Sequence, residues 1–457
     1  HDSADIVAAY QAARRAEMSV GLRGGGNSYG DAALNDGALV VDCSGMDRIL
    51  RWDATSGAIT VGPGVTIARL WRHLLPEGWL PMVVPGASAV TVGGAAAANV
   101  HGKNNWRVGS FGDHILSFEI ITPSGERLTC SRMENADLFH AAIGGMGLLG
   151  CFVSLTLQSR RVYSGLVAAL RTAHDSLDAL LQALEEATAW ADDLVAWLDT
   201  GARGASLGRG LLNATRDLAA GEDPQPTRTL SPVWQERSLG ALRLAQALPE
   251  GWLPWLARPM ASPLGVALAN RAQWMLGSRR ALRMADLRHA PGRPTYTSYV
   301  AGNFPLDAIP NWRDSYRPGG LMQHQSFLPR EAAVSGFRQL IERSQAVGIA
   351  PSLAVLKKQR ASGFLLNYLV DGYSLALDYP VRRGREAETL MLMRELNAIT
   401  LDHGGRLYLA KDGALTAEQA ARMYPAETLT RFHALKARYD SEGLLQTNLY
   451  RRVFKGD

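Results

Sequence analysis

Short apolar runs and helically spaced apolar positions alternate along the first third of the chain. In residues 6–15 the apolar spacing and the alanine content are typical of a helix. Four later runs, MSVGLRG, GALVVDCS, GAITVGPG and SFEIITPSGERLTC, are strand-like and are separated by Gly, Asp and Pro turn residues. This pattern predicts an α+β region that extends to about Gln158.

The middle of the chain has a less regular pattern. Residues from about 160 to 284 are expected to be more helical, and the run DSLDALLQALEEATAWADDLVAWL is the clearest amphipathic helix. Residues 239–287 are rich in Leu, Ala and Trp, and they contain several arginines and four prolines. We expect a set of short helices packed on the domain. The alternative is a surface that enters a bilayer interface, where Trp and Arg side chains are favoured.

Strand patterns return from Thr295 onward. The runs LMQHQSFLP, SLAVLKKQ and FLLNYLVDGYSLALDYP are strand-like, and Asp371-Gly372 is expected to turn the last run into a hairpin. Helices are predicted at residues 330–346 and 385–404, so this part should form an antiparallel sheet backed by helices. The run GRLYLAKDG is predicted to be a further alternating strand, followed by a final helical segment.

Length and composition limit what the protein can be. The chain has 457 residues, of which 47% are hydrophobic. This is longer than a chain that folds around one ordinary hydrophobic core, so two domains are expected. The net charge of +5 comes from 48 basic and 43 acidic residues spread along the chain, whereas a nucleic-acid-binding protein would concentrate its basic residues. Only six of the basic residues are lysines, and a buried lysine can act as a base or donor in ways that arginine cannot.

The cysteines and the absence of targeting signals bear on location. Three cysteines in apolar settings, with no metal-ligand spacing, favour a reducing compartment and no metal site. We see no signal peptide, although the chain begins at His1 and an N-terminal segment could precede it. No window supplies the roughly 18 apolar residues of a membrane-spanning helix. A cytoplasmic protein is expected, with peripheral contact at the inner face of the membrane as the alternative.

Three glycine-rich segments carry the strongest chemical signal. In RGGGNSYGD the consecutive glycines could form an anion-binding nest, but their spacing and the strand-like run that follows disfavour a Rossmann NAD site. In VVPGASAVTVGGAAAANVHGKNNWRVGSFG, small side chains would let the backbone lie against a planar ligand, and Gly93-Gly94 could start a short helix facing its phosphates. The third segment is AAIGGMGLLG. Together they indicate a large, planar, phosphate-bearing cofactor.

The order of RGGGNSYGD, PGASAVTVGGAAAANVHGKN and GGMGLLG resembles the FAD-binding domain of the vanillyl-alcohol oxidase and p-cresol methylhydroxylase (PCMH) superfamily. Within it, HGKN, GSFG, LMQHQSFLP, LDYP and GGRLYLAKD resemble the decaprenylphosphoryl-β-D-ribose oxidase family. The likeness covers nearly the whole chain and is weakest at residues 160–294. It implies a two-domain α+β, PCMH-type fold: an FAD-binding domain at 1–166, an antiparallel-sheet substrate-binding domain backed by helices at 167–405, and a C-terminal segment, 406–457, that returns to the FAD-binding domain.

The resemblance also implies how FAD is held. The first loop would wrap the pyrophosphate, and the second segment would follow the cofactor toward its ring. Many superfamily members carry a histidine in the first loop, in the pattern R-G-G-G-H, that bonds covalently to the flavin. This chain has Asn27 there, so FAD is expected to be non-covalent. The implied FAD contacts are Arg23, Gly24, Gly25, Gly26, Asn27, Ser28, Tyr29, Gly86, Ala87, Thr91, Gly93, Gly94, Ala97, His101, Gly102, Val153, Tyr408 and Lys411.

The resemblance places the chemistry beside the flavin. Flavin oxidation of a carbinol needs an aimed C–H bond and a group that takes or shares the hydroxyl proton. Lys411 corresponds to the lysine that the family places there, and the alternative is a charged turn residue paired with Asp412. Tyr408 would be the aromatic partner of the flavin. His101 and Tyr29 are further catalytic candidates, each with a purely structural role or a cofactor contact as the alternative.

Strand alternation indicates a substrate surface. In YSLALDYP, Ser374, Ala376 and Asp378 share a small, polar face that could line a cavity for a sugar, although an ordinary half-exposed sheet would give the same pattern. Other members of the family resemble NICVDF here, so this departure leaves the identity of the sugar open. Lys357 could meet a phosphate of the substrate. The expected substrate contacts are Lys103, Gln323, Gln325, Lys357, Ser374 and Ala376.

The function implied is hydride transfer from a secondary alcohol of a sugar-like substrate, such as a polyprenyl-phosphate-linked pentose, to FAD. The family pairs this step with a separate short-chain reductase, which makes it the first half of an epimerisation in cell-wall biosynthesis, and such a reductase partner is expected. Two alternatives stay open. One is an FAD-dependent oxidase of another polyol or natural-product alcohol, and the other is a non-catalytic peripheral membrane flavoprotein.

Overall fold

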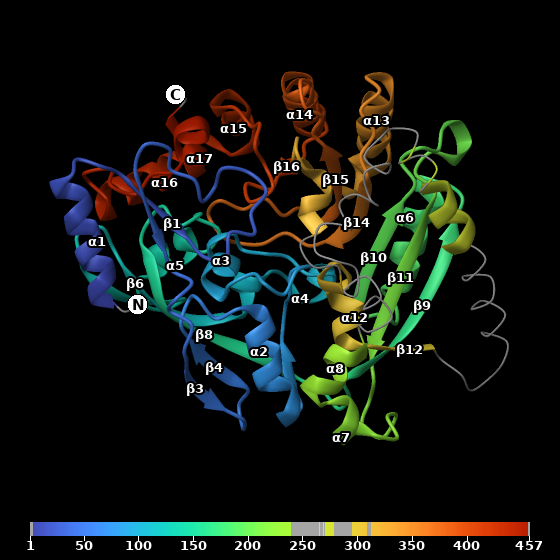
Figure 1. Cartoon of the computed structure of the whole chain (residues 1–457), viewed down its shortest axis with the longest axis horizontal. Coiled ribbons are helices and arrows are strands. Elements are labelled where there is room, and N and C mark those ends of the chain that lie inside the picture. Colours follow the sequence, from blue (N-terminus) through green and yellow to red (C-terminus); the bar gives the residue numbers. More distant parts are fainter. Residues whose placement is uncertain are drawn as a thin grey trace.

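Two antiparallel sheets lie side by side in the computed structural model, which describes residues 3–238, 265, 268, 270–277, 295–308 and 312–455 (Figure 1). Together with the helices they form the expected α+β fold. Most of the Trp- and Arg-rich stretch at 239–287 lies outside the described residues. Among the residues that are described, no helix has the length and apolar character to cross a membrane.

The first sheet has six strands and comes from the N-terminal third of the chain. Its strands run in the order β3-β4-β8-β6-β7, and β5 also pairs with β8. A separate parallel pair, β1 and β2, precedes it. The strands and helices of this region are α1 (Ser3–Arg15), β1 (Val20–Arg23), β2 (Leu39–Asp42), β3 (Ile49–Asp53), β4 (Ala58–Val61), α2 (Ile67–Leu74), β5 (Trp79–Pro81), α3 (Val92–Ala97), α4 (Asn105–Val108), β6 (Ile115–Ile121), β7 (Arg127–Ser131), α5 (Ala136–Ala142) and β8 (Cys151–Arg161).

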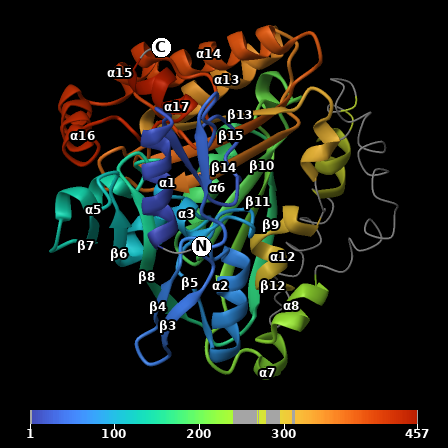
Figure 2. The same ribbon diagram turned by 60° about the vertical axis from the view of Figure 1, so that its left-hand side comes forward.

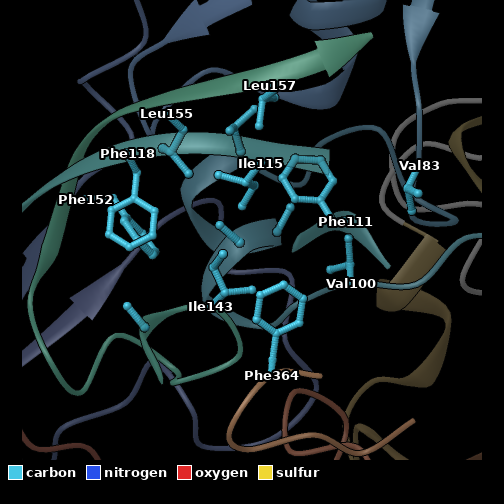
Figure 3. Packing of buried hydrophobic residues seen from close by; sticks show 14 of the residues in the cluster. Val83, Val100, Phe111, Ile115, Phe118, Ile143, Phe152, Leu155, Leu157 and Phe364 are labelled. Carbon is cyan, nitrogen blue, oxygen red and sulfur yellow. The ribbon is translucent and has the colours of Figure 1, made fainter. Parts of the chain in front are cut away.

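Aromatic and branched side chains from β6 and β8 form the core of this region (Figure 3). The rings of Phe118 and Phe152 meet edge to face at 4.9 Å, a favourable arrangement for two aromatic rings. Phe364, more than 200 positions later in the chain, packs into the same cluster and lies 6.5 Å from Phe139. A loop between the strands of the second sheet therefore anchors that sheet to the first core.

The second sheet has eight strands in the order β12-β9-β11-β10-β14-β15-β13-β16, all antiparallel. One face packs on helices α6, α13 and α14, which carry the second hydrophobic core. The elements are β9 (Leu166–His174), α6 (Leu177–Ala187), β10 (Asp193–Leu198), β11 (Gly210–Asp217), α7 (Pro226–Thr229), α8 (Pro232–Ser238), β12 (Thr295–Ser298), α12 (Tyr299–Asn303), β13 (Leu321–Pro329), α13 (Ala333–Ala346), β14 (Leu353–Gln359), β15 (Gly372–Pro380), α14 (Glu386–Asp402) and β16 (Arg406–Leu407).

The alternation predicted for β15 is confirmed. Tyr373, Leu375, Leu377 and Tyr379 belong to the core under the helices, so the intervening side chains point to the opposite face of the sheet. That face has no helical cover from α6, α13 or α14, and it borders the cavity described below.

Three predictions of secondary structure were wrong. The long amphipathic helix ends at Ala187, and Asp193–Leu198 is instead strand β10, paired with β11 and β14 on its two edges. A short apolar run has the same hydrophobicity pattern in a buried strand and in a buried helix. Here the pairing with β11 and β14 determines that the run is a strand. Residues 160–217 accordingly contain three strands, so this part is less helical than expected.

The expected hairpin at Asp371-Gly372 does not form. Residues 364–370 are a buried loop, and β15 pairs with β13 and β14. The side chain of Asn367 bonds to the backbone of Leu369, and such local bonds compete with a strand ladder. The strand predicted for GRLYLAKDG is also shorter than expected, because β16 covers only Arg406–Leu407 and Lys411 lies in the turn that follows.

The C-terminal helices contact the N-terminal elements (Figure 2). These helices are α15 (Ala417–Met423), α16 (Ala426–Tyr439) and α17 (Asn448–Tyr450). The backbone N–H of Val20 donates to the carbonyl of Leu444 at 2.8 Å, and Arg452 forms ion pairs with Asp31 at 2.7 Å and Asp412 at 2.9 Å. These contacts hold the turn that carries Lys411 against the glycine loop.

Candidate active site

A cavity of about 1020 Å³ lies between the glycine-rich segments and the open face of the eight-stranded sheet. Ligand sites usually measure about 300–1,000 Å³, so this one suits a large cofactor together with a substrate. Three predicted site residues, Gly102, Val153 and Ser374, lie outside its lining. The predicted residues that line it are Arg23, Gly24, Gly25, Gly26, Asn27, Ser28, Tyr29, Gly86, Ala87, Thr91, Gly93, Gly94, Ala97, His101, Lys103, Gln323, Gln325, Lys357, Ala376, Tyr408 and Lys411.

The first two glycine segments are fastened to each other. A Cβ atom at Gly24 would stand 2.3 Å from Thr91 Oγ1, so only glycine allows this approach. The same hydroxyl caps helix α3 and accepts a bond from the N–H of Gly25 at 3.3 Å. The amide of Asn27 donates to the carbonyls of Gly25 and Ala89 at 3.0 and 3.1 Å. Asn27 thus joins the two loops at the position where a covalent histidine would stand.

Lys411 lies in the turn after β16, opposite the first glycine loop. Its ammonium group is 3.6 Å from the centroid of the Tyr29 ring, a close cation–π contact. Asp412 forms its ion pair with Arg452, so the alternative of a turn lysine paired with Asp412 is wrong. Burial lowers the pKa of Lys411 to about 7, although the Asp378 carboxylate opposes this. The amine therefore changes its charge near neutral pH.

Asp378 on β15 faces the same part of the cavity. It stands opposite Gln323 on β13, whose amide donates to Asp378 Oδ1. The other oxygen, Oδ2, is buried and has no hydrogen-bond partner among the described residues. Burial raises the pKa of Asp378 to about 6. Strand alternation placed Asp378 on this face, but Asp378 was not among the predicted site residues.

His101 is held as a neutral ring in the cavity wall. Its Nε2 lies 2.9 Å from the amide nitrogen of Gln325, and its Nδ1 lies 3.3 Å from that of Gln359. A neutral imidazole has one donor and one acceptor, so one of these amides must present its oxygen. Burial, and then the charges of Lys357 and Lys411, hold the pKa of His101 well below its ordinary value. His101 therefore suits a rigid contact better than proton transfer.

Ser374 does not line the cavity. Its hydroxyl accepts a hydrogen bond from the amide of Gln359 at 2.7 Å. It supports the glutamine that contacts His101. The aromatic wall behind His101 includes Tyr408, which stacks on Tyr368 with ring centroids 4.1 Å apart. The ring of Tyr408 is 5.7 Å from that of His101.

Two further half-buried lysines line the cavity. Lys103 donates to the backbone carbonyls of Gly302 and Asn303, the latter at 3.4 Å, and burial lowers its pKa to about 8. Burial, and then the charge of Lys103, lower the pKa of Lys357 to about 8 as well, while Asp193 opposes both shifts. The part of the cavity beside these two lysines can hold an anionic group.

Several cavity residues were missed by the sequence analysis. Asp193 and its neighbours on β9 to β11 line the sheet face, in the region that was expected to be helical. Arg313 stacks over the Tyr29 ring at 5.1 Å and donates to the Asn27 carbonyl at 3.4 Å. No signal in the sequence identified Arg313. If these strands had been predicted, side-chain alternation along them would have identified the other missed cavity residues: Arg171, Asp193, Asn213 and Thr215.

The glycine-rich wall fits a flat cofactor. Gly86 lines the cavity, and a Cβ atom added there would meet nothing within 4 Å. Gly94 also lines the cavity, and a Cβ atom there would touch only Thr91 Oγ1, at 3.1 Å. Larger side chains at these positions would therefore extend into the space that the cofactor needs. Among the described residues, no cluster of three or more His, Cys, Asp or Glu side chains could hold a metal ion.

This chain is similar to several known proteins. A family described as an FAD binding domain matches residues 1–131. Decaprenylphosphoryl-β-D-ribose oxidase of Mycolicibacterium smegmatis is 30% identical, over 98% of this chain and 92% of that protein. L-gulonolactone oxidase of Bos taurus is 31% identical over 32% of this chain and 33% of that protein. The structure of 6-hydroxy-D-nicotine oxidase from Arthrobacter nicotinovorans matches with a TM-score of 0.64 at 16% identity, covering 100% of this chain and 90% of that one, which shows a shared fold.

Proposed function

This chain belongs to the decaprenylphosphoryl-β-D-ribose oxidase family of FAD-dependent oxidoreductases, within the vanillyl-alcohol oxidase and p-cresol methylhydroxylase superfamily; from this premise we propose that it oxidises a secondary alcohol of a sugar-like substrate to a ketone. The proposed substrate is a pentose linked to a polyprenyl phosphate. When bound, FAD would supply the oxidising power as the acceptor of a hydride from the carbinol carbon. The residues of the protein would bind the substrate, orient its carbinol and control the charges around the reacting oxygen.

The observation that carries the proposal is the charge pattern along the cavity. Lys411 and Asp378 lie beside the glycine loop, and Lys103 and Lys357 lie near Asp193. Desolvated cations are costly unless an opposite charge compensates them, and among the described residues Asp193 is the one carboxylate that opposes the pKa shifts of both lysines. A phosphodiester would supply the missing negative charge. A sugar attached to it would extend along the sheet toward Lys411.

The side chains that the sheet presents between these two pairs of charged residues are small or polar, as a sugar site requires. Ala376 leaves room between the facing side chains, and Gln325 is held by its bond to His101. Lys411 can hydrogen-bond the reacting oxygen, and its positive charge stabilises negative charge that develops there. Tyr29 holds the Lys411 ammonium group from the other side.

FAD is proposed to be held without a covalent bond. Asn27 has no nucleophilic ring nitrogen, and its amide is already engaged by two backbone carbonyls. We also propose that a separate short-chain reductase reduces the ketone product, so that the two steps together invert the carbinol. Peripheral contact with the inner face of a membrane would give access to a prenyl-linked substrate.

Anaerobic bleaching of the flavin tests the proposed function. The purified holoenzyme is mixed without oxygen with four probes: a short-chain prenylphosphoryl pentose, the free pentose, a prenyl alcohol and an unrelated polyol. We expect rapid bleaching with the prenylphosphoryl pentose and slower bleaching with the free pentose. Bleaching by the polyol alone would instead support an oxidase of another alcohol. The absence of bleaching with every alcohol would support the non-catalytic alternative.

A further inference from the structure

Asp378 has one oxygen atom that the protein leaves without a donor. Its side chain is buried, with 1% of its surface exposed. Gln323 donates to Oδ1, whereas Oδ2 has no hydrogen-bond partner among the described residues. A buried carboxylate oxygen without a donor costs free energy, so a donor supplied by a ligand would stabilise it. The residue lines the cavity, and the ligand that enters the cavity can supply that donor.

The neighbouring groups do not fill this role. Lys411 and Arg313 contribute positive charge around the Asp378 carboxylate, but neither bonds to Oδ2. Tyr316 bonds to Ser352 at 3.1 Å, and Tyr29 stacks with the Lys411 ammonium group.

The neighbouring position on the same face of the strand carries a small side chain. The side chain that precedes Asp378 on the same face of β15 is Ala376, which ends at Cβ. Tyr379, the next residue, points to the opposite face, where its hydroxyl lies 2.7 Å from that of Ser344. Because Asp378 lines the cavity, a hydroxyl group of the proposed substrate would approach Oδ2 from the cavity side.

We propose that Asp378 binds the reacting hydroxyl of the substrate through Oδ2 and accepts its proton during the oxidation. In this step the O–H bond breaks and its proton moves to Oδ2, while the C–O bond becomes a carbonyl. The C–H bond breaks at the same carbon, and its electron pair leaves with the hydrogen as a hydride to FAD, the oxidant. This inference rests on the proposed function, and it assigns the base for that reaction.

The other candidate bases are less suited to this role. Both ring nitrogens of His101 already lie within hydrogen-bond distance of glutamine amides. Lys411 is more useful as a cation, because its charge favours the ionised form of Asp378 and stabilises negative charge on the reacting oxygen. The pKa of Asp378, raised by burial to about 6, leaves the carboxylate ionised at neutral pH and still basic enough to accept a proton.

Chemical rescue tests the assignment. Reduction of the flavin by a prenylphosphoryl pentose, or by whichever alcohol bleaches the wild type, is followed by anaerobic rapid mixing in Asp378→Asn and Asp378→Ala. Loss of a general base lowers the rate of a reaction by about 10²–10⁴-fold, so flavin reduction in both variants should be at least a hundredfold slower than in the wild type. Formate should restore reduction in Asp378→Ala, with a rate that follows the concentration of the formate anion. Slowing by less than tenfold, or loss without rescue, would overturn the proposal.

A second readout needs no substrate. Infrared spectra of the holoenzyme should show a carboxylic acid band that appears as the pH is lowered through about 6 and that is missing in Asp378→Asn. Asp223→Asn is the matched control, because Asp223 is a buried carboxylate outside the cavity that accepts bonds from Ser164 and Thr229. It should keep the band and the wild-type reduction rate. A wild-type spectrum without a band that depends on Asp378 would contradict the proposal, whereas failure of every alcohol to bleach the wild type would refute the proposed function instead.

Discussion

Replacing Lys411 with methionine should make the protein more stable at acidic pH while it removes activity. The side chain faces the cavity, and burial lowers its pKa from 10.5 to about 7. A shift of this size corresponds to roughly 5 kcal/mol of unfavourable free energy for the charged form. Because Lys411 is only half-buried, we expect the realised effect to be on the order of 2–5 kcal/mol.

The sign follows from proton binding. Between pH 7 and 10.5 the unfolded chain binds a proton at Lys411 and the folded protein does not, so the stability of the wild type rises with pH in this window. Below pH 7 Lys411 is protonated in both the folded and the unfolded protein, so the full free-energy cost of burying its charge is present. Methionine has a similar length and no charge, so Lys411→Met should remove this cost at pH 6 and make little difference above pH 10.5.

Urea unfolding of wild type and Lys411→Met at pH 6 and pH 9 measures the effect, with the cofactor-free proteins compared so that FAD affinity does not contribute. The gain in the free energy of unfolding should be larger at pH 6 than at pH 9. In the holoprotein, the variant should lose at least a hundredfold in the rate of flavin reduction, because the positive charge beside the reacting oxygen is gone. Equal stability at pH 6, or a less stable variant, would show that the charged Lys411 does not destabilise the folded protein.

Three further outcomes are expected. Acid precipitation should release all of the yellow colour into the supernatant, and a coloured pellet would show a covalent flavin. Gly24→Ala should raise the dissociation constant for FAD at least tenfold in a fluorescence titration, because its Cβ atom would stand 2.3 Å from Thr91 Oγ1; unchanged affinity would show that the loops can separate without cost. Arg452→Met should lower the free energy of unfolding by about 3–5 kcal/mol, because it leaves the buried Asp412 without its partner. Arg385→Met, which breaks an exposed ion pair, should cost less than about 1 kcal/mol, and equal losses in the two variants would contradict this argument.

Regular periodicity allowed much of the fold to be predicted from the sequence. The strands at Leu321–Pro329 and Leu353–Gln359, and the helices at Ala333–Ala346 and Glu386–Asp402, lie where the pattern placed them. The prediction failed at Asp193–Leu198, where an apolar run next to a real helix forms a central strand. Its conformation depends on partners more than 10 residues away in β11 and about 160 residues away in β14. Local pattern carries no information about such pairing.

The site was predictable where it follows alternation or a glycine motif. Gln323 and Ala376 could be placed on one face because strand side chains alternate. Arg313 could not, because its position over the Tyr29 ring depends on how a short helix between strands packs onto the first glycine loop. Asp378 was visible on the correct face, but its significance came from burial and from Oδ2 without a donor. Neither property can be read from a single sequence.

Transfer of deuterium tests the central claim most directly. A prenylphosphoryl pentose is prepared with deuterium at each secondary carbinol carbon in turn and mixed anaerobically with the holoenzyme, while flavin bleaching is followed and the product is analysed by mass spectrometry. The account predicts that deuterium at one carbon slows bleaching and is lost from the product, which becomes the ketone at that carbon. Bleaching that is equally fast with every labelled probe, or a product that keeps all of its deuterium, would contradict oxidation of a secondary sugar alcohol by this protein.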